Sequence, residues 1–269
     1  MHGAGNGFVL LDNTHSDLSE EDCRTLAVRL CTADGMDGLI AIIPASDADI
    51  GMLFINSDGS VGEMCGNGAR CLAKYAVEHG LASDPGNIRI RTDAGLVRAR
   101  RVTDEVYEVR LNDPSVLDPH RHVYFDGQDF DCFYTELGDP GIPHAVIFTE
   151  DDPHLCRDAL RETGRAIRYA KEFPRGANVS FVQKTGPDTA KAVTYERGVE
   201  DFTLACGTGC GAVACAFSVL SGTPRTHVTI EMPGGTLDVS LINKSGIIRN
   251  ILLTGPAVTV GKGETASIS

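Results

Sequence analysis

The sequence predicts an α+β fold made of two related halves, and two observations carry this prediction. Short apolar segments rich in β-branched residues far outnumber amphipathic helical segments, which favours α+β over a regular alternation of strands and helices. A cysteine- and glycine-containing pattern also occurs twice, about half a chain apart. The length of 269 residues suits one large domain or two modest ones.

Four segments have the sequence features of helices. The first begins at Ser19, a good N-cap residue, and continues with acidic residues that favour the positive end of the helix dipole. The expected helices are 19–30, 67–78, 151–170 and 209–220.

Short alternating or fully apolar segments predict the strands of both halves. The expected strands are 8–12, 39–44, 51–56, 88–92, 97–102, 106–111, 145–148, 179–183, 191–195, 228–232, 236–241 and 248–254. Turn-forming residues at 112–115 and 118–119 predict a linker near the middle of the chain.

The repeated pattern is a Cys-Gly-x-Gly unit followed by an expected helix. The two copies start at Cys65 and Cys206, and the polar residues Asn56 and Arg197 stand at the same distance before them. Because the similarity extends beyond the four residues, duplication of a half explains it better than coincidence.

Each unit places a thiol and flexible backbone at the start of a helix. Unpaired N–H groups and the helix dipole favour an anion there, and the same field is expected to lower the pKa of a thiol. A single unit would equally suit an acyl transferase with a nucleophilic cysteine. Duplicated halves usually face each other, so two thiols would flank one ligand. That arrangement suits inversion at a carbon α to a carboxylate, with one thiolate removing the proton and the other thiol replacing it.

Composition narrows the class of partner. A net charge of −13 argues against nucleic acid or an anionic membrane. No apolar run is long enough to span a membrane, no signal peptide is visible, and nine cysteines in a chain of this size are expected to be reduced in the cytoplasm.

No lysine has a recognisable pyridoxal phosphate context, and the spacing of Cys206, Cys210 and Cys215 matches no common zinc or iron–sulfur site. We therefore expect neither a cofactor nor a metal.

Six motifs, in order along the chain, resemble those of the diaminopimelate epimerase family. They are 1–6 (MHGAGN), 56–60 (NSDGS), 64–71 (MCGNGARC), 176–179 (GANV), 195–198 (YERG) and 204–209 (LACGTG). The proline racemase and hydroxyproline epimerase branch typically has His where Asn67 stands, and the phenazine-biosynthesis-like isomerases lack the cysteine pair.

The resemblance implies two pseudo-symmetric halves, each a mixed, barrel-like sheet around a central helix. Residues 1–116 with 254–269 would form the half that carries Cys65, and residues 117–253 the half that carries Cys206. The implied function is cofactor-independent epimerisation of LL-2,6-diaminopimelate to meso-diaminopimelate, for lysine and peptidoglycan precursors. A cytoplasmic homodimeric isomerase with a small amino-acid substrate is expected.

The resemblance also implies roles for individual residues. Cys65 and Cys206 would be the acid–base pair, and His144 and Glu196 would tune the thiols. The backbone N–H groups expected to hold the reacting carboxylate are those of Gly66, Asn67, Gly207 and Thr208. The side chains expected to bind the distal end of the substrate are those of Asn6, Asn56, Asn178, Glu196 and Arg197.

Two alternatives stay open on the sequence. Ile142, Phe202 and the short segment 31–38 differ from the usual family pattern, so a racemase of another polar amino acid on the same scaffold is one alternative. A non-catalytic amino-acid-binding protein is the other. Two retained cysteines speak against it, because binding alone does not require two thiols.

Overall fold

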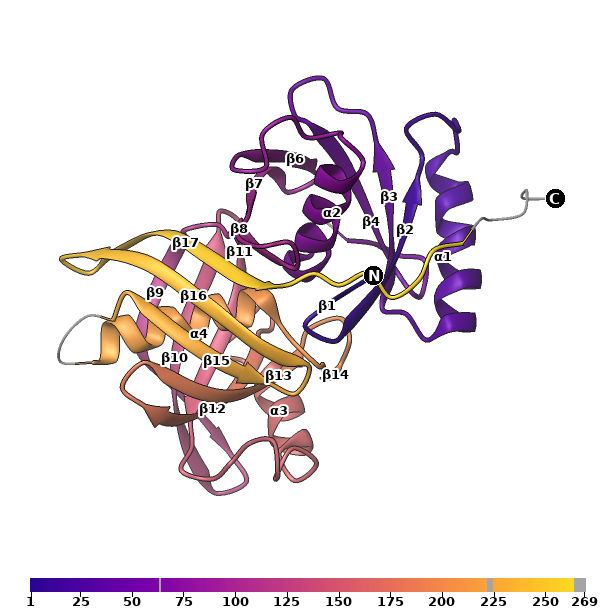
Figure 1. Cartoon of the computed structure of the whole chain (residues 1–269). Helices are drawn as coiled ribbons and strands as arrows, with labels where there is room; N and C mark the ends of the chain where they lie inside the picture. Colours follow the sequence, from indigo (N-terminus) through magenta and orange to yellow (C-terminus); the bar gives the residue numbers. More distant parts are fainter. Residues whose placement is uncertain (63, 222–224, 264–269) are drawn as a thin grey trace. The chain divides into compact units, whose positions relative to one another are not determined.

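The computed structural model describes residues 1–62, 64–221 and 225–263, and its backbone divides into two compact units (Figure 1). The N-terminal unit consists of Met1–Val109 and the chain from Thr254 onward, and the C-terminal unit is Arg110–Leu253. In each unit a mixed sheet surrounds one largely buried helix. The α+β fold class is therefore confirmed.

The N-terminal unit contains a mixed sheet and two helices. In chain order its elements are β1 (His2–Gly3), β2 (Asn6–Asp12), α1 (Glu20–Asp34), β3 (Gly38–Ile43), β4 (Ile50–Asn56), β5 (Val61–Gly62), α2 (Gly66–Glu78), β6 (Ile88–Thr92), β7 (Gly95–Arg101) and β8 (Val106–Arg110). Strand β2 pairs in parallel with β3, β3 is antiparallel to β4, and β4 pairs with both β5 and β6. The hairpin β6–β7 continues to β8.

The C-terminal unit repeats this order after one added strand at its start. Its elements are β9 (Pro114–Phe125), β10 (Gln128–Gly138), β11 (Gly141–Phe148), α3 (Arg161–Arg168), β12 (Asn178–Gly186), β13 (Thr189–Glu196), β14 (Asp201–Phe202), α4 (Gly207–Leu220), β15 (His227–Met232), β16 (Gly235–Lys244) and β17 (Ile247–Pro256). Strand β11 is parallel to β12, β12 is antiparallel to β13, and β13 pairs with both β14 and β15. The internal similarity of the sequence thus corresponds to a repeated supersecondary structure.

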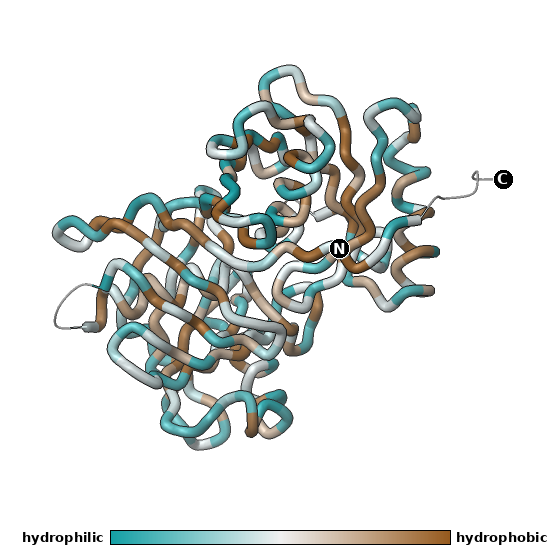
Figure 2. Tube along the Cα trace, viewed as in Figure 1, coloured by the Kyte–Doolittle hydropathy of each residue, from teal (hydrophilic) through white to brown (hydrophobic). Residues whose placement is uncertain are grey.

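Strand β3 is apolar at nearly every position and does not alternate between polar and apolar residues. Leu39 and Ala41 pack in a cluster with α1, whereas Ile40 reaches Gly68 on α2. Helices therefore cover both faces of the strand, and nearly every residue of it is buried. Figure 2 shows the resulting hydrophobic segment along β2 and β3. In the C-terminal unit, α4 is almost wholly buried among the strands around it.

The structure corrects three of the predicted elements. The segment 112–119 is not a linker throughout, because β9 begins at Pro114 and pairs along its length with β10. Both strands escaped prediction since their exposed positions carry charged and histidine side chains, which pair across the hairpin as His120–Asp131 and His122–Asp129.

The expected helix 151–170 forms only at Arg161–Arg168. Before it the chain makes successive turns around Asp152, whose side chain accepts from the His154 N–H at 2.9 Å and from Lys191 of β13 at 2.5 Å. A carboxylate fixed by a strand in this way favours a turn over a continuous helix.

The start of α1 is as the sequence predicts, and the helix ends later than expected. The Asp22 N–H donates to Ser19 Oγ at 3.2 Å, and the Ser19 N–H donates to Asp22 Oδ2 at 3.0 Å, which completes a capping box. The helix continues to Asp34 and ends at Gly35 in the left-handed region, with φ of 63°.

Ser19→Ala should lower the free energy of unfolding by about 1 kcal/mol, because the N-cap hydroxyl satisfies a helix N–H that has no partner within the helix. Urea unfolding followed by circular dichroism measures this loss. Thr25→Ala is the control, since Thr25 is an exposed hydroxyl residue inside the same helix and its loss should be neutral or slightly stabilising. Equal effects of the two substitutions would contradict the capping interpretation.

Candidate active site

Both predicted catalytic cysteines are N-cap residues of the central helices. Cys65 precedes α2 with φ of −130° and ψ of 117°, and Cys206 precedes α4 with φ of −113° and ψ of 107°. A two-residue strand, β5 or β14, leads into each of them. The first N–H groups of each helix have no partner within the helix, so both cysteines adjoin a set of donors suited to an anion.

The last glycine of each Cys-Gly-x-Gly unit is required by close packing. A Cβ on Gly68 would lie 2.8 Å from Ile40 Cδ1. A Cβ on Gly209 would lie 3.0 Å from Thr194 Oγ1 and 3.1 Å from Cys206 Sγ. These separations are shorter than ordinary van der Waals contact, so a side chain at either glycine would require the neighbouring atoms to shift.

The environment of Cys206 favours the protonated thiol. The side chain is 5% exposed, and its Sγ accepts from the Gly209 N–H at 3.4 Å, with Thr208 Oγ1 3.7 Å away. Burial, reinforced by the negative charge of Glu196, raises the pKa of Cys206 well above its usual value, and the two donors only partly oppose this. The expectation that the helix start lowers the pKa of the thiol is therefore wrong for Cys206, because burial outweighs it. Cys65 is half-buried.

Two of the predicted binding residues meet beside Cys65. The Asn67 side-chain amide donates to Asn6 Oδ1 at 3.0 Å, and Arg70 Nη2 donates to Asn67 Oδ1 at 2.8 Å. Arg70 is fully buried and its Nε also donates to the Pro256 carbonyl at 3.4 Å. Sequence reasoning included Arg70 in a motif but gave it no role, although a charged residue one turn into a helix that is expected to be buried is a usable signal.

Asn56 forms its side-chain hydrogen bonds with Ser60 and not with Asn6, Asn67 or Arg70. Its side-chain nitrogen donates to Ser60 Oγ at 2.9 Å, and its backbone N–H donates to the Ser60 carbonyl at 2.8 Å. In this structure the residue closes the turn between β4 and β5.

A second group of predicted residues meets in the C-terminal unit. Asn178 Oδ1 accepts from the Arg197 N–H at 2.8 Å, while its Nδ2 donates to the Pro143 carbonyl at 3.3 Å. His144 is the register partner of Asn178 in the parallel β11–β12 pair. It is fully buried, and burial together with the positive charge of Arg197 lowers its pKa to about 3, so the imidazole is neutral near pH 7. Glu196 accepts a hydrogen bond from the Thr203 hydroxyl.

The repeated topology shows how the two units differ at one position. Phe8 pairs with Gly38, the first residue of β3, and His144 pairs with Asn178, the first residue of β12. Counting back two residues from each, Ile142 holds the place in the C-terminal unit that Asn6 holds in the N-terminal unit. Only the N-terminal unit therefore has an amide at this position.

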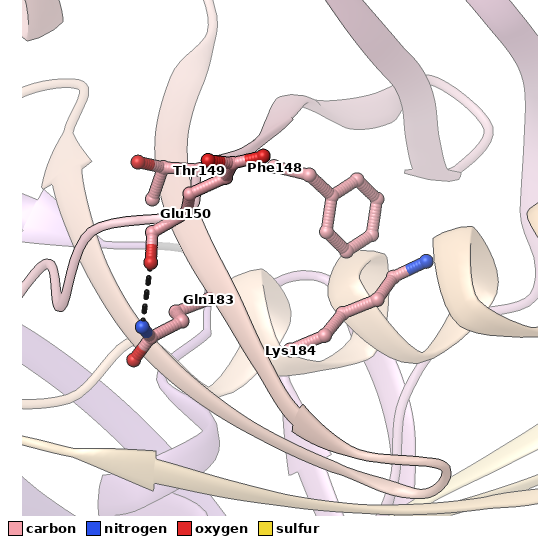
Figure 3. A pocket seen from close by; sticks show the side chains of 5 residues that line it. All are labelled: Phe148, Thr149, Glu150, Gln183 and Lys184. Atoms are coloured by element: carbon pink, nitrogen blue, oxygen red, sulfur yellow. Dashed lines mark hydrogen bonds between the residues drawn. The ribbon is translucent and has the colours of Figure 1, made fainter.

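One pocket in the C-terminal unit is lined by none of these residues. It is lined by Phe148, Thr149, Glu150, Gln183 and Lys184, where β11 ends beside β12 (Figure 3). Its polar groups largely bind one another or a ring: Gln183 Nε2 donates to the Glu150 carbonyl at 2.7 Å, and Lys184 Nζ lies 4.3 Å from the centre of the Phe148 ring. It contains none of the predicted site residues.

Among residues 1–62, 64–221 and 225–263, no group of three or more His, Cys, Asp or Glu side chains is arranged to hold a metal ion. Within the same described residues, none of the helices has the length and apolar character that a membrane crossing requires.

Gly209→Ala should lower the free energy of unfolding by about 1–3 kcal/mol, because the added methyl group would overlap Cys206 Sγ and Thr194 Oγ1. Thermal and urea unfolding measure the effect. Gly263→Ala provides the control, since a Cβ there would meet nothing within 4 Å. A Gly209→Ala protein as stable as the control would contradict the close packing described above.

Comparison with known proteins identifies the family of the chain. The family model for diaminopimelate epimerase matches residues 1–115 and 138–260. The chain is 37% identical over 284 residues to a diaminopimelate epimerase of Aquifex aeolicus, covering 98% of this chain and 95% of that protein. It is 34% identical over 275 residues to a diaminopimelate epimerase of Methanocella arvoryzae, covering 98% and 94%.

Solved structures show the same fold at low sequence identity. A phenazine biosynthesis protein of Bacillus anthracis has a TM-score of 0.76 at 16% identity, over 99% of this chain and 98% of the other. A probable proline racemase of Agrobacterium radiobacter has a TM-score of 0.70 at 17% identity, over 98% and 91%. These likenesses establish the fold, whereas the family follows from the sequence comparisons: the chain belongs to the diaminopimelate epimerase family.

Proposed function

We propose that this protein interconverts LL-2,6-diaminopimelate and meso-diaminopimelate without a cofactor, using Cys65 and Cys206 as an acid–base pair. The observation that carries the proposal is the pair of N-cap cysteines at corresponding positions of two repeated units, in a chain that belongs to this epimerase family. Binding alone would not require both thiols, so the repeated cysteine favours inversion at a stereogenic carbon.

The proposed reaction moves one proton off Cα and another onto its opposite face. One cysteine, as thiolate, takes the Cα proton, and the carbanion's charge spreads into the adjacent carboxylate. The N–H groups at the starts of α2 and α4, including those of Gly66, Asn67, Gly207 and Thr208, would stabilise that charge. The second cysteine then donates its proton to Cα. Because its pKa is raised, Cys206 would be protonated when the substrate binds and would act as the proton donor, with Cys65 as the base. The two roles would exchange in the reverse direction.

We assign the distal end of the substrate to Arg197, Glu196 and Asn178 of the second group, together with Asn6 and Asn56. A guanidinium has five N–H donors, and among the described residues one of those on Arg197 donates to the Arg175 carbonyl, at 3.2 Å. Arg197 is exposed, and its backbone is held by Asn178, so its side chain is positioned to bind a carboxylate. Glu196 would accept from the distal ammonium, as would the amide oxygens of Asn6 and Asn56. His144 would tune the ionisation of the neighbouring groups, and because its imidazole is neutral it would not place an additional charge in the site.

A cytoplasmic location and a homodimer are further parts of the proposal that rest on the sequence. The presence of Ile142 where the repeated unit has Asn6 favours one competing activity, a racemase of another polar amino acid. The deciding experiment is proton NMR in D₂O with LL-diaminopimelate and a panel of L-amino acids. Exchange of the Cα proton with conversion of LL to meso supports the proposal, and exchange confined to another amino acid would overturn it.

Replacing either Cys65 or Cys206 by Ala should abolish net epimerisation, because each thiol serves one face of Cα. The loss should exceed about a thousandfold, as expected for removal of an essential acid or base. Interconversion of the two diastereomers, separated by chromatography, provides the measurement. Cys156→Ala is the control, since Cys156 belongs to the turns before α3 and no site motif includes it. Near-normal turnover in either active-site variant would contradict the two-cysteine mechanism.

Arg197→Lys should raise the KM for diaminopimelate about tenfold with a smaller change in kcat. Lysine keeps the charge but loses the two-pronged contact with a carboxylate, a difference of about 1–2 kcal/mol. Steady-state kinetics provide the test, with Arg165→Lys on the exposed side of α3 as the control. An unchanged KM would mean that the substrate of this enzyme has no distal carboxylate at Arg197.

A further inference from the structure

We infer that Arg168 and Glu200 form a positioning pair that fixes the turn bearing Glu196 and Arg197, an inference that rests on the proposed function for its catalytic consequence. Neither residue belongs to the predicted site. Arg168 ends α3, and Glu200 lies in the turn between β13 and β14, so the pair joins segments that are far apart in sequence.

Glu200 organises the turn through its backbone. Its N–H donates to the Glu196 carbonyl at 2.8 Å, and its carbonyl accepts from the Tyr195 hydroxyl at 2.7 Å. Its φ of 58° lies in the left-handed region, which a residue with a side chain adopts only at a cost of about 1 kcal/mol or more. The surrounding contacts must therefore hold it there.

The Glu200 carboxylate supplies such contacts. Its Oε1 accepts from the Gly198 N–H at 3.0 Å, from Arg168 Nη2 at 2.8 Å and from Arg168 Nε at 3.2 Å. Arg168 is 9% exposed, so its charge is largely withdrawn from water and depends on this partner. Although burial acts in the opposite direction, the Gly198 N–H, the Tyr169 hydroxyl and the Arg168 guanidinium hold the pKa of Glu200 below its usual value.

Arg168 also contacts the segment that leads to Asn178. Its carbonyl accepts from the Ala177 N–H at 3.2 Å. Gly176 has φ of 65°, and a Cβ there would lie 1.8 Å from Arg168 Nη1, so the guanidinium rests directly on this glycine. Asn178 in turn accepts from the Arg197 N–H. One buried arginine therefore fixes both chain segments that meet at the backbone of Arg197.

A neighbouring ion pair offers a matched control. Arg161, at the start of the same helix, binds the carboxylate of Asp201, the residue after Glu200. Both of its side chains are 46% exposed, and the structure assigns the pair no contact with Gly176 or the Gly198 N–H. Removing this pair takes away a similar charge interaction between α3 and β14, next to the turn, without releasing the turn.

The test compares Arg168→Met, Glu200→Gly, their double variant and Arg161→Met. Glycine suits the left-handed conformation, so Glu200→Gly removes the carboxylate while relieving the strained backbone, which separates positioning from loss of folding. The first readout is amide hydrogen exchange of a peptide spanning residues 195–203, measured by mass spectrometry without substrate. We expect about tenfold faster exchange in Arg168→Met and Glu200→Gly, and wild-type exchange in Arg161→Met.

The second readout is steady-state kinetics with LL-diaminopimelate. We expect KM to rise about tenfold in each single variant, kcat to change less than about threefold, and the double variant to be no worse than either single one. In an Arg197→Lys background, Arg168→Met should add little. Unchanged exchange at 195–203, additive effects in the double variant, or a loss that Arg161→Met reproduces would overturn the positioning pair. A wild-type enzyme without turnover of diaminopimelate would instead refute the proposed function, while the exchange measurement still decides whether the pair fixes the turn.

Discussion

The close approach of each central helix to the strand beneath its first turn is the constraint on which the candidate site depends. A cysteine at the N-cap, with glycine three residues later, is the arrangement that lets each helix start there, and in α4 the Cys206 thiol accepts from the Gly209 N–H. At Gly209 even one added carbon would contact Cys206 Sγ at 3.1 Å. The spacing of the motif is therefore set first by packing, and the anion-binding helix start follows from that packing.

The two units share this backbone arrangement but differ in the chemistry around it. In the N-terminal unit, buried Arg70 holds Asn67, which holds Asn6, in a continuous polar chain. In the C-terminal unit the places of Asn6 and Arg70 are taken by Ile142 and by Gly211, where a Cβ would meet Leu111 Cδ1 at 2.8 Å. At these two positions the repeated backbone thus carries polar side chains in the N-terminal unit and an apolar side chain or none in the C-terminal unit. This asymmetry suits a substrate whose two ends require different treatment.

Much of this organisation could be predicted from the sequence, and the misses have physical reasons. Helices α1, α2 and α4 were predictable because caps and glycines act within a few residues. Strands β9 and β10 were not, since pairing across the hairpin, rather than an apolar alternation, holds their exposed His and Asp side chains. The joint role of Arg168 and Glu200 depends on a contact between residues 32 positions apart, which neither local spacing nor composition reveals.

The misjudged pKa of Cys206 bears on how the proposed chemistry works. Local sequence shows the helix start, which stabilises a thiolate, but burial depends on the whole C-terminal unit and acts in the opposite direction. In the reverse direction, in which Cys206 would act as the base, the raised pKa makes its thiolate rarer, yet each thiolate that forms is a stronger base. Abstraction of the proton from Cα is difficult because carbon acids are weak. A stronger base therefore compensates for the low population of the thiolate. The donors at Gly209 and Thr208 then limit the energetic penalty of forming that thiolate without solvating it as water would. Burial and the helix start are therefore complementary: burial makes the thiolate a stronger base, and the donors at the helix start limit the free energy needed to form it.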